Sequence, residues 1–121
     1  MGPSVGLQPW RVDDYRTPQG GRPVKEFLNG LSKAAKPKVY AALAMLEEHG
    51  NQLLMPHSRA MGSGLYELRI AHQEGPVRVL YCFRSGRRIV LLHAFVKKTE
   101  RTPKSDLDLA RARKRALDEE G

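Results

Sequence analysis

The chain has 121 residues, 40% of them hydrophobic and 28% charged, which is the composition of an ordinary globular protein and the length of one domain. The single cysteine, Cys82, excludes an intramolecular disulfide and a CxxC-type metal site, and no apolar run reaches the roughly 18 residues of a membrane span. Lysine and arginine outnumber aspartate and glutamate by 21 to 13, a net charge of +8, which favours a polyanionic partner, nucleic acid first and an acidic protein second.

The first half of the chain predicts a short strand followed by two helices. Apolar and polar residues alternate over 10–16, and the Pro- and Gly-rich stretch 17–23 predicts a loop. Apolar residues at helical spacing predict a helix over 23–31 and a second one that begins after an N-cap at Ser32 and ends at Gly50. Two helices joined by so short a link form a helical hairpin.

After residue 50 the periodicity changes from that of helices to that of strands. Residues 51–64, with three Pro or Gly residues, predict a connecting loop. Strands are predicted at 65–71, 77–84 and 88–97. Because short turns join them, they form an antiparallel meander. Thr102 then caps a C-terminal helix that opens at Pro103 and runs to about residue 118.

These elements predict an α+β fold, in which an N-terminal helical hairpin packs on a small antiparallel β-sheet and a basic C-terminal helix follows. We expect a tail over residues 1–9 and a single domain over 10–118. The tail has neither the basic nor the apolar region of a secretory signal, so we expect a cytoplasmic protein. Residues 97–115 carry eight basic side chains against three acidic ones, which concentrates positive charge in the second half.

Two arginines are the first candidates for chemistry. Arg69 and Arg78 lie on neighbouring predicted strands separated by a short turn, so they can approach one another in the sheet. Two adjacent guanidiniums repel unless an anion such as a phosphate sits between them. Glu67, two residues from Arg69 on the same strand face, is the predicted neutraliser, with a plain surface Glu–Arg pair as the alternative. Lys97 and Lys98 end the third strand, where alternation lets only one face the arginines; a solvated charge run is their alternative.

The remaining residue types exclude several kinds of catalysis. No histidine has ligand spacing with another His, Cys or acid, so we expect no metal site. No Ser–His–Asp order, GxSxG motif or phosphate-binding loop occurs. His93, inside an apolar strand, is favoured as a structural core histidine over a catalytic one. Tyr66 follows a Gly-containing loop, and it either belongs to the core or stacks on an exposed base.

Several motifs in combination resemble the phage-derived, Gp49-like branch of the RelE/HigB toxins. They are GLYELRI at 64–70, VRVLYCF at 77–83, IVLLHAFVKKTERTP at 89–103 and the basic, Ala-rich helix that follows. The earlier RPVKEFLNGL and the Leu-rich helix ending in HG at 49–50 are similar to the same family. The resemblance covers roughly residues 10–118 and implies the same α+β fold.

The resemblance implies the toxin of a type II toxin–antitoxin system, which cleaves mRNA on the ribosome without a metal or other cofactor. Such an enzyme assists attack of a ribose 2′-OH on the adjacent phosphate, and cations stabilise the pentavalent phosphorane. Arg78 is then expected to clamp the phosphate, Arg69 to position the backbone, and Lys97 or Lys98 to neutralise the leaving side. His93 is a candidate for proton transfer. Further RNA contacts are expected from Tyr66, Arg101, Lys104 and Arg111.

The sequence departs from this family at two places. Some relatives carry a tyrosine near the start of the last helix, where this chain reads KSDLDLA. Others have a lysine in the strand where this chain has Glu67. Proton transfer therefore has only His93 and Tyr66 as candidates, or catalysis proceeds by charge and positioning with the ribosome completing the arrangement.

The family also implies a protein partner. A small antitoxin, typically a helix-turn-helix protein of the HigA type, is expected to cover the basic face and block access to mRNA and the ribosome. The chain itself shows no DNA-reading helix-turn-helix, so we expect no sequence-specific DNA binding by it alone, and no membrane partner. Two alternatives stay open: a non-catalytic RNA- or ribosome-binding module, and an interaction protein whose basic helix holds an acidic partner.

Overall fold

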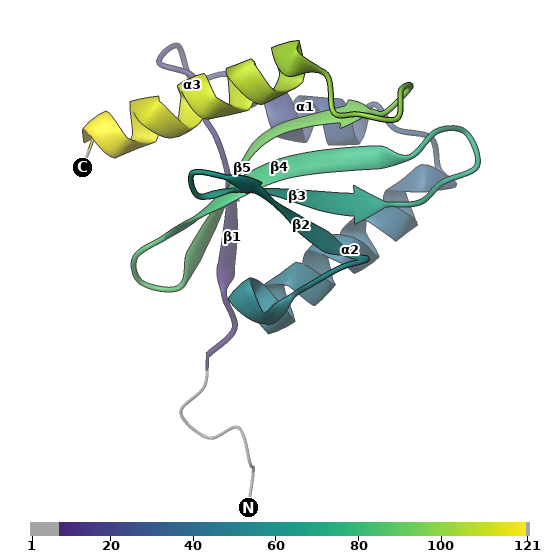
Figure 1. The fold of residues 1–121 in the computed structure, drawn as a ribbon, viewed down its shortest axis with the longest axis horizontal. Coiled ribbons are helices and arrows are strands. Elements are labelled where there is room, and N and C mark those ends of the chain that lie inside the picture. Colours follow the sequence, from purple (N-terminus) through teal and green to yellow (C-terminus); the bar gives the residue numbers. More distant parts are fainter. Residues whose placement is uncertain (1–7, 121) are drawn as a thin grey trace, which may run out of the picture.

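The computed structural model describes residues 8–120 and shows one five-stranded sheet with helices on both faces (Figure 1). The helices are α1 (Pro23–Asn29), α2 (Ala35–His49) and α3 (Lys104–Glu120), with a one-turn 3-10 helix, η1, at Gly50–Gln52. The strands are β1 (Arg11–Asp14), β2 (Ser58–Gly62), β3 (Leu65–Ile70), β4 (Val77–Arg84) and β5 (Arg88–Val96), in the spatial order β1-β5-β4-β3-β2. Of the predicted tail, residues 1–7 lie outside the described residues. No helix within residues 8–120 is long and apolar enough to cross a lipid bilayer.

The α+β class and the three-strand meander are confirmed. Strands β3, β4 and β5 begin at the predicted residues, end within one residue of the predicted ends and pair in antiparallel fashion. The alternating or continuous apolar character of these strands made them recognisable, since one or both of their faces are buried. The predicted helices also form, with their ends shifted by up to three residues.

Two details of the predicted fold are wrong, and a third fits only in part. The sheet is mixed, because β1 pairs in parallel with β5. The predicted loop 51–64 contains β2, a mostly exposed edge strand whose sequence SRAMG lacks apolar alternation. The helical hairpin fits only in part: α1 and α2 cover the same face of the sheet, but α1 packs mainly on β5 and α2 on β3, so the sheet rather than a helix–helix contact holds them.

The sheet separates two hydrophobic cores. On one face, α1 and α2 contribute Val24, Leu28, Val39 and Leu46 to a cluster with the inward residues of β3, β4 and β5. On the other face, Ala110 of α3 packs with Leu65, Leu80, Cys82, Val90 and Leu92. Burial of these apolar side chains on both faces accounts for the position of the sheet between its helices.

Helix α3 is held to the sheet by guanidinium hydrogen bonds as well as by apolar contacts. Arg113 Nη1 donates to the Leu92 carbonyl at 2.8 Å. Arg111 donates from Nη2 to Met61 O at 3.0 Å and from Nη1 to Gly62 O at 3.1 Å. Ala110 is the one fully buried residue of this helix, and Leu107 and Leu117 pack partly buried against the same cluster, so these bonds to the strands add to an apolar attachment.

The turn at Gly50 gives a test of the packing between β1 and α2. Gly50 has φ +50°, and a Cβ placed there would lie 2.0 Å from Trp10 Nε1. We therefore expect Gly50→Ala to destabilise the protein by about 2 kcal/mol, through steric overlap added to backbone strain. Thermal and urea denaturation measure the loss, and tryptophan fluorescence reports the displaced indole.

Gly20→Ala is the matched control, because Gly20 also has positive φ (+90°) but has nothing within 4 Å of its added Cβ. It reports the strain alone. Equal destabilisation by the two substitutions would contradict a specific role for the Trp10–Gly50 contact.

Candidate cationic site on the sheet

The pairing of β3 with β4 brings the two predicted arginines together. Arg69 lies directly opposite Arg78 in the antiparallel register. Because side chains alternate along a strand, Glu67 shares the face of Arg69, while Leu68 and Ile70 pack in the core on the opposite face. Arg69 and Glu67 lie on the sheet face that α3 covers, so the charged cluster is on the same side as the basic helix.

Glu67 neutralises only part of this charge. Its Oε1 lies 3.7 Å from Arg78 Nε and 4.0 Å from Arg69 Nε, and its Oε2 accepts a hydrogen bond from the Thr102 hydroxyl. The Glu67 side chain is 1% exposed and that of Arg78 8% exposed, so the surface-pair alternative for Glu67 is wrong. One carboxylate between two guanidiniums leaves the cluster with an excess of one positive charge.

Both guanidiniums keep unused hydrogen-bonding capacity. The Nε atoms of Arg69 and Arg78 are buried and have no hydrogen-bond partner among residues 8–120. Their side chains line an open cavity of 310 Å³ together with Pro56, Ala71, His72 and Pro76. Burial lowers the pKa of Arg78, the charge of Glu67 opposes that shift, and Arg69 adds to it; an arginine stays protonated at neutral pH all the same. The site can therefore accept an anion.

Lys97 is the lysine that the sheet directs towards the arginines. Its backbone N–H donates to the Pro76 carbonyl at 2.7 Å, which extends the β4–β5 ladder by one residue. It follows Phe95 by two positions, and Phe95 pairs with Arg78 and packs on the α3 face. Alternation then puts Lys97 on the arginine face, whereas Lys98 is exposed one residue further on.

A β-bulge turns His93 towards the same face. The register passes from Leu80↔His93 to Tyr81↔Leu91, so Leu92 is the extra residue and both it and His93 face α3. His93 Nε2 lies 2.6 Å from Asp106 Oδ1 in the first turn of α3, and the imidazole stacks on Phe95. The sequence prediction missed Asp106, because its pairing depends on a bulge that strand periodicity does not reveal.

The other predicted RNA contacts are spread over several surfaces. Tyr66 lies on the opposite face, 5.7 Å from the ring of Tyr81, in an aromatic cluster, so the structure does not bring it to the arginines. Lys104 forms an ion pair with Asp108, Arg101 is exposed just before α3, and Arg111 is bonded to β2 carbonyls.

Thr102 has a role that the sequence did not predict. The prediction assigned its hydroxyl to the cap of the last helix, but that hydroxyl donates to Glu67 and so anchors the start of α3 to the arginine cluster. A threonine before Pro103 is a helix-start signal in any sequence, and only the folded sheet places a carboxylate within its reach. Over residues 8–120, no three His, Cys, Asp or Glu side chains converge as metal ligands.

Fold and site together define a small basic α+β protein in which two facing arginines of the sheet line an open cavity. The chain belongs to the phage-derived Gp49-like protein family, whose model matches residues 26–115, and this confirms the resemblance at the level of that family. The family is commonly related to toxin–antitoxin systems. No curated protein matches the chain.

The charge balance of the cluster can be tested through Glu67. Glu67→Gln removes the one carboxylate between two partly buried cations, so we expect a loss of about 3 kcal/mol of folding free energy. Inorganic phosphate is expected to restore part of this loss by replacing the anion, and to stabilise the variant more than the wild type. Urea denaturation with and without phosphate measures both effects.

Glu74→Gln is the control, because the Glu74 side chain is 63% exposed, and its carboxylate lies 3.8 Å from His72 Nδ1 and 3.0 Å from the Ser32 hydroxyl rather than between the two arginines. That substitution is expected to change stability by less than about 1 kcal/mol. A phosphate response of the same size in both variants would contradict an anion site between Arg69 and Arg78.

Proposed function

We propose that this protein is the toxin of a type II toxin–antitoxin system and acts as a ribosome-dependent mRNA endonuclease that inhibits translation. The observation that supports this most directly is the facing pair Arg69–Arg78, which has one shared carboxylate and opens to a cavity. Membership of the Gp49-like family supports the toxin–antitoxin context.

In the proposed reaction a ribose 2′-OH attacks the neighbouring phosphate and the 5′-oxygen of the next nucleotide leaves. Negative charge grows on the non-bridging oxygens as the phosphorane forms, so fixed cations lower the barrier. Arg78 is rigidly held by burial and by its bond to the Val77 carbonyl, which suits it to clamp the phosphate. Arg69 is more exposed, at 26%, and positions the RNA backbone. Lys97 faces the leaving oxygen.

Proton transfer is assigned in this proposal to His93. The 2′-OH must lose a proton and the leaving oxygen must gain one. Asp106 orients the imidazole through Nε2, and no hydrogen bond of Nδ1 occurs within residues 8–120. His93 is therefore a histidine with one fixed nitrogen and one available nitrogen, on the face that carries the arginines.

The proposed partners follow from the charge of the molecule. Messenger RNA in the ribosome supplies the polyanion, with Lys98, Arg101, Lys104 and Arg111 as further backbone contacts and Tyr66 as a separate stacking contact on the other face. An antitoxin, in this proposal a helix-turn-helix protein, silences the toxin in the cytoplasm by covering the cationic face.

The experiment is cleavage of a translated message by purified protein. Ribosomes programmed with a defined mRNA are incubated with the protein, and new 5′ ends are mapped by primer extension. We expect cuts inside the coding region, and we expect Arg78→Ala to slow cleavage by about 100-fold or more. Lys38→Ala, an exposed cation on α2, is the matched control and should cleave at the wild-type rate.

Arg78→Ala also leaves Glu67 without its buried partner, so thermal denaturation must accompany the assay. Arg69→Ala provides a second variant that disturbs the core less, because that side chain is partly exposed. Salt-sensitive ribosome binding without cut messages would favour the non-catalytic module. Intact messages and no binding would remove both RNA functions.

A further inference from the structure

Strand β1 presents a sheet edge with unused backbone groups. Among the described residues 8–120 it pairs on one side only, with β5. Arg11 N donates to Arg87 O at 2.9 Å and Tyr15 N to Leu91 O at 2.8 Å, so the odd-numbered residues face β5. In a parallel ladder the residues between them turn their N–H and C=O groups the other way. The backbone N–H and C=O groups of Val12 and Asp14 therefore face outward, and no other backbone group within residues 8–120 is hydrogen-bonded to them.

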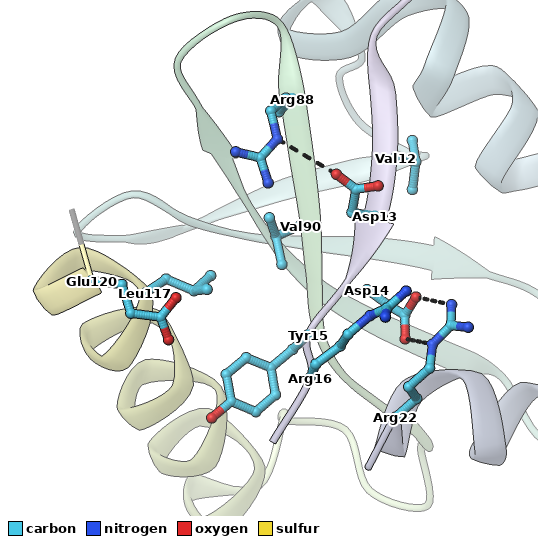
Figure 2. A pocket seen from close by; sticks show the side chains of 10 residues that line it. All are labelled: Val12, Asp13, Asp14, Tyr15, Arg16, Arg22, Arg88, Val90, Leu117 and Glu120. Carbon is cyan, nitrogen blue, oxygen red and sulfur yellow. Dashed lines mark hydrogen bonds and ion pairs between the residues drawn. The ribbon is translucent and has the colours of Figure 1, made fainter. Parts of the chain in front are cut away.

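Open cavities flank this edge on both faces of the sheet. One, of 340 Å³, lies towards α3 and is shown in Figure 2; Arg16, Arg88, Leu117 and Glu120 are among its lining residues. The other, of 210 Å³, lies towards α1 and α2. Val12, Asp13 and Asp14 border both. A strand added along β1 would direct successive side chains to opposite faces, and so into these two cavities in alternation.

The cavity beside α1 and α2 is suited to apolar side chains. Its walls include Val24 and Leu28 of α1 and Leu43 of α2. Tyr40, which also borders it, is 50% exposed. An aliphatic side chain placed here would cover apolar surface that water now contacts.

The cavity beside α3 is suited to a carboxylate. Asp14 already receives two hydrogen bonds from Arg22, at 3.0 and 2.5 Å (Figure 2). Asp13 is shared between Arg11 and Arg88, each 3.5 Å away. The Nε of Arg88 is nonetheless buried without a hydrogen-bond partner in the part of the chain that the structure describes.

The arginines that line this cavity therefore have N–H donors that its carboxylates do not accept. Arg16 lines the cavity and forms no ion pair within residues 8–120. The lining is balanced in formal charge, with Arg16, Arg22 and Arg88 against Asp13, Asp14 and Glu120. Arg16, which has no ion pair within residues 8–120, is therefore the group that an incoming acidic side chain would bind.

We infer that the outer edge of β1 binds an extended segment of a partner protein, in which apolar and acidic residues alternate, as a sixth strand of the sheet. Backbone hydrogen bonds to Val12 and Asp14 supply affinity, and the two cavities supply specificity. The opposite edge is less suitable, since β2 carries a bulge between Ala60 and Gly62 and its end is bonded to Arg111. The inference does not require RNA cleavage.

The experiment uses a synthetic peptide of about eight residues in which valine and glutamate alternate. Two control peptides keep the length: one replaces glutamate by lysine, and one has the same composition with all valines before all glutamates. We expect the alternating Val/Glu peptide to bind at least about tenfold more tightly than either control. Its binding should slow hydrogen exchange of the Val12 and Asp14 amides selectively, as measured by NMR.

Val12→Pro removes the outward donor and leaves the β1–β5 hydrogen bonds intact, which an edge strand tolerates. Val12→Ala is the matched control, because it shortens the side chain and retains the N–H. We expect the first to weaken peptide binding about tenfold and the second by less than about threefold. Thermal denaturation verifies that each variant folds, and cleavage of mRNA should be unchanged in both.

Equal binding to Val12→Pro and Val12→Ala, or equal affinity for the three peptides, would overturn the inference. Sedimentation of the protein alone is the last measurement. A concentration-dependent dimer that Val12→Pro abolishes would show that a second copy of the chain occupies this edge, and would replace the proposed partner.

Discussion

The rest of the structure depends on how a single buried carboxylate is shared between two guanidiniums. Arg69 and Arg78 are forced into opposition by the register of β3 and β4, and without a counter-charge their repulsion in a partly buried site would oppose that register. Glu67 relieves the repulsion and, through Thr102, also fixes the start of α3. The same contact thus stabilises the sheet, positions the last helix and leaves a residual positive charge facing a cavity.

Sequence reasoning recovered those parts of the fold whose hydrophobic pattern is local. The apolar runs of β3, β4 and β5 and the 3.6-residue spacing of α1 and α2 each follow from a face that is buried. Strand β2 was not predicted, because its strand conformation comes from pairing with β3 and its own side chains show no strand pattern. The parallel pairing of β1 with β5 joins segments more than 70 residues apart in the chain, and no local pattern records such a pairing.

The same distinction applies to the candidate site. The approach of Arg69 and Arg78 was predictable, since a short turn between two strands limits where both can lie. The choice of Lys97 over Lys98 needed the observed end of the β5 ladder. The pairing of His93 with Asp106 and that of Thr102 with Glu67 arise from a bulge and from the path of the chain into α3. Both are tertiary contacts between residues that the sequence presents as unrelated.

Part of the net positive charge of this protein belongs to arginines that attach α3 to the sheet. Arg111 and Arg113 each direct donors to strand carbonyls, so part of the hydrogen-bonding capacity of these two side chains holds the helix, while their positive field still reaches a polyanion outside. Lysine at these positions would preserve the field and lose the fastening. Helix attachment and net charge can therefore be changed separately by substitutions at these two positions of α3.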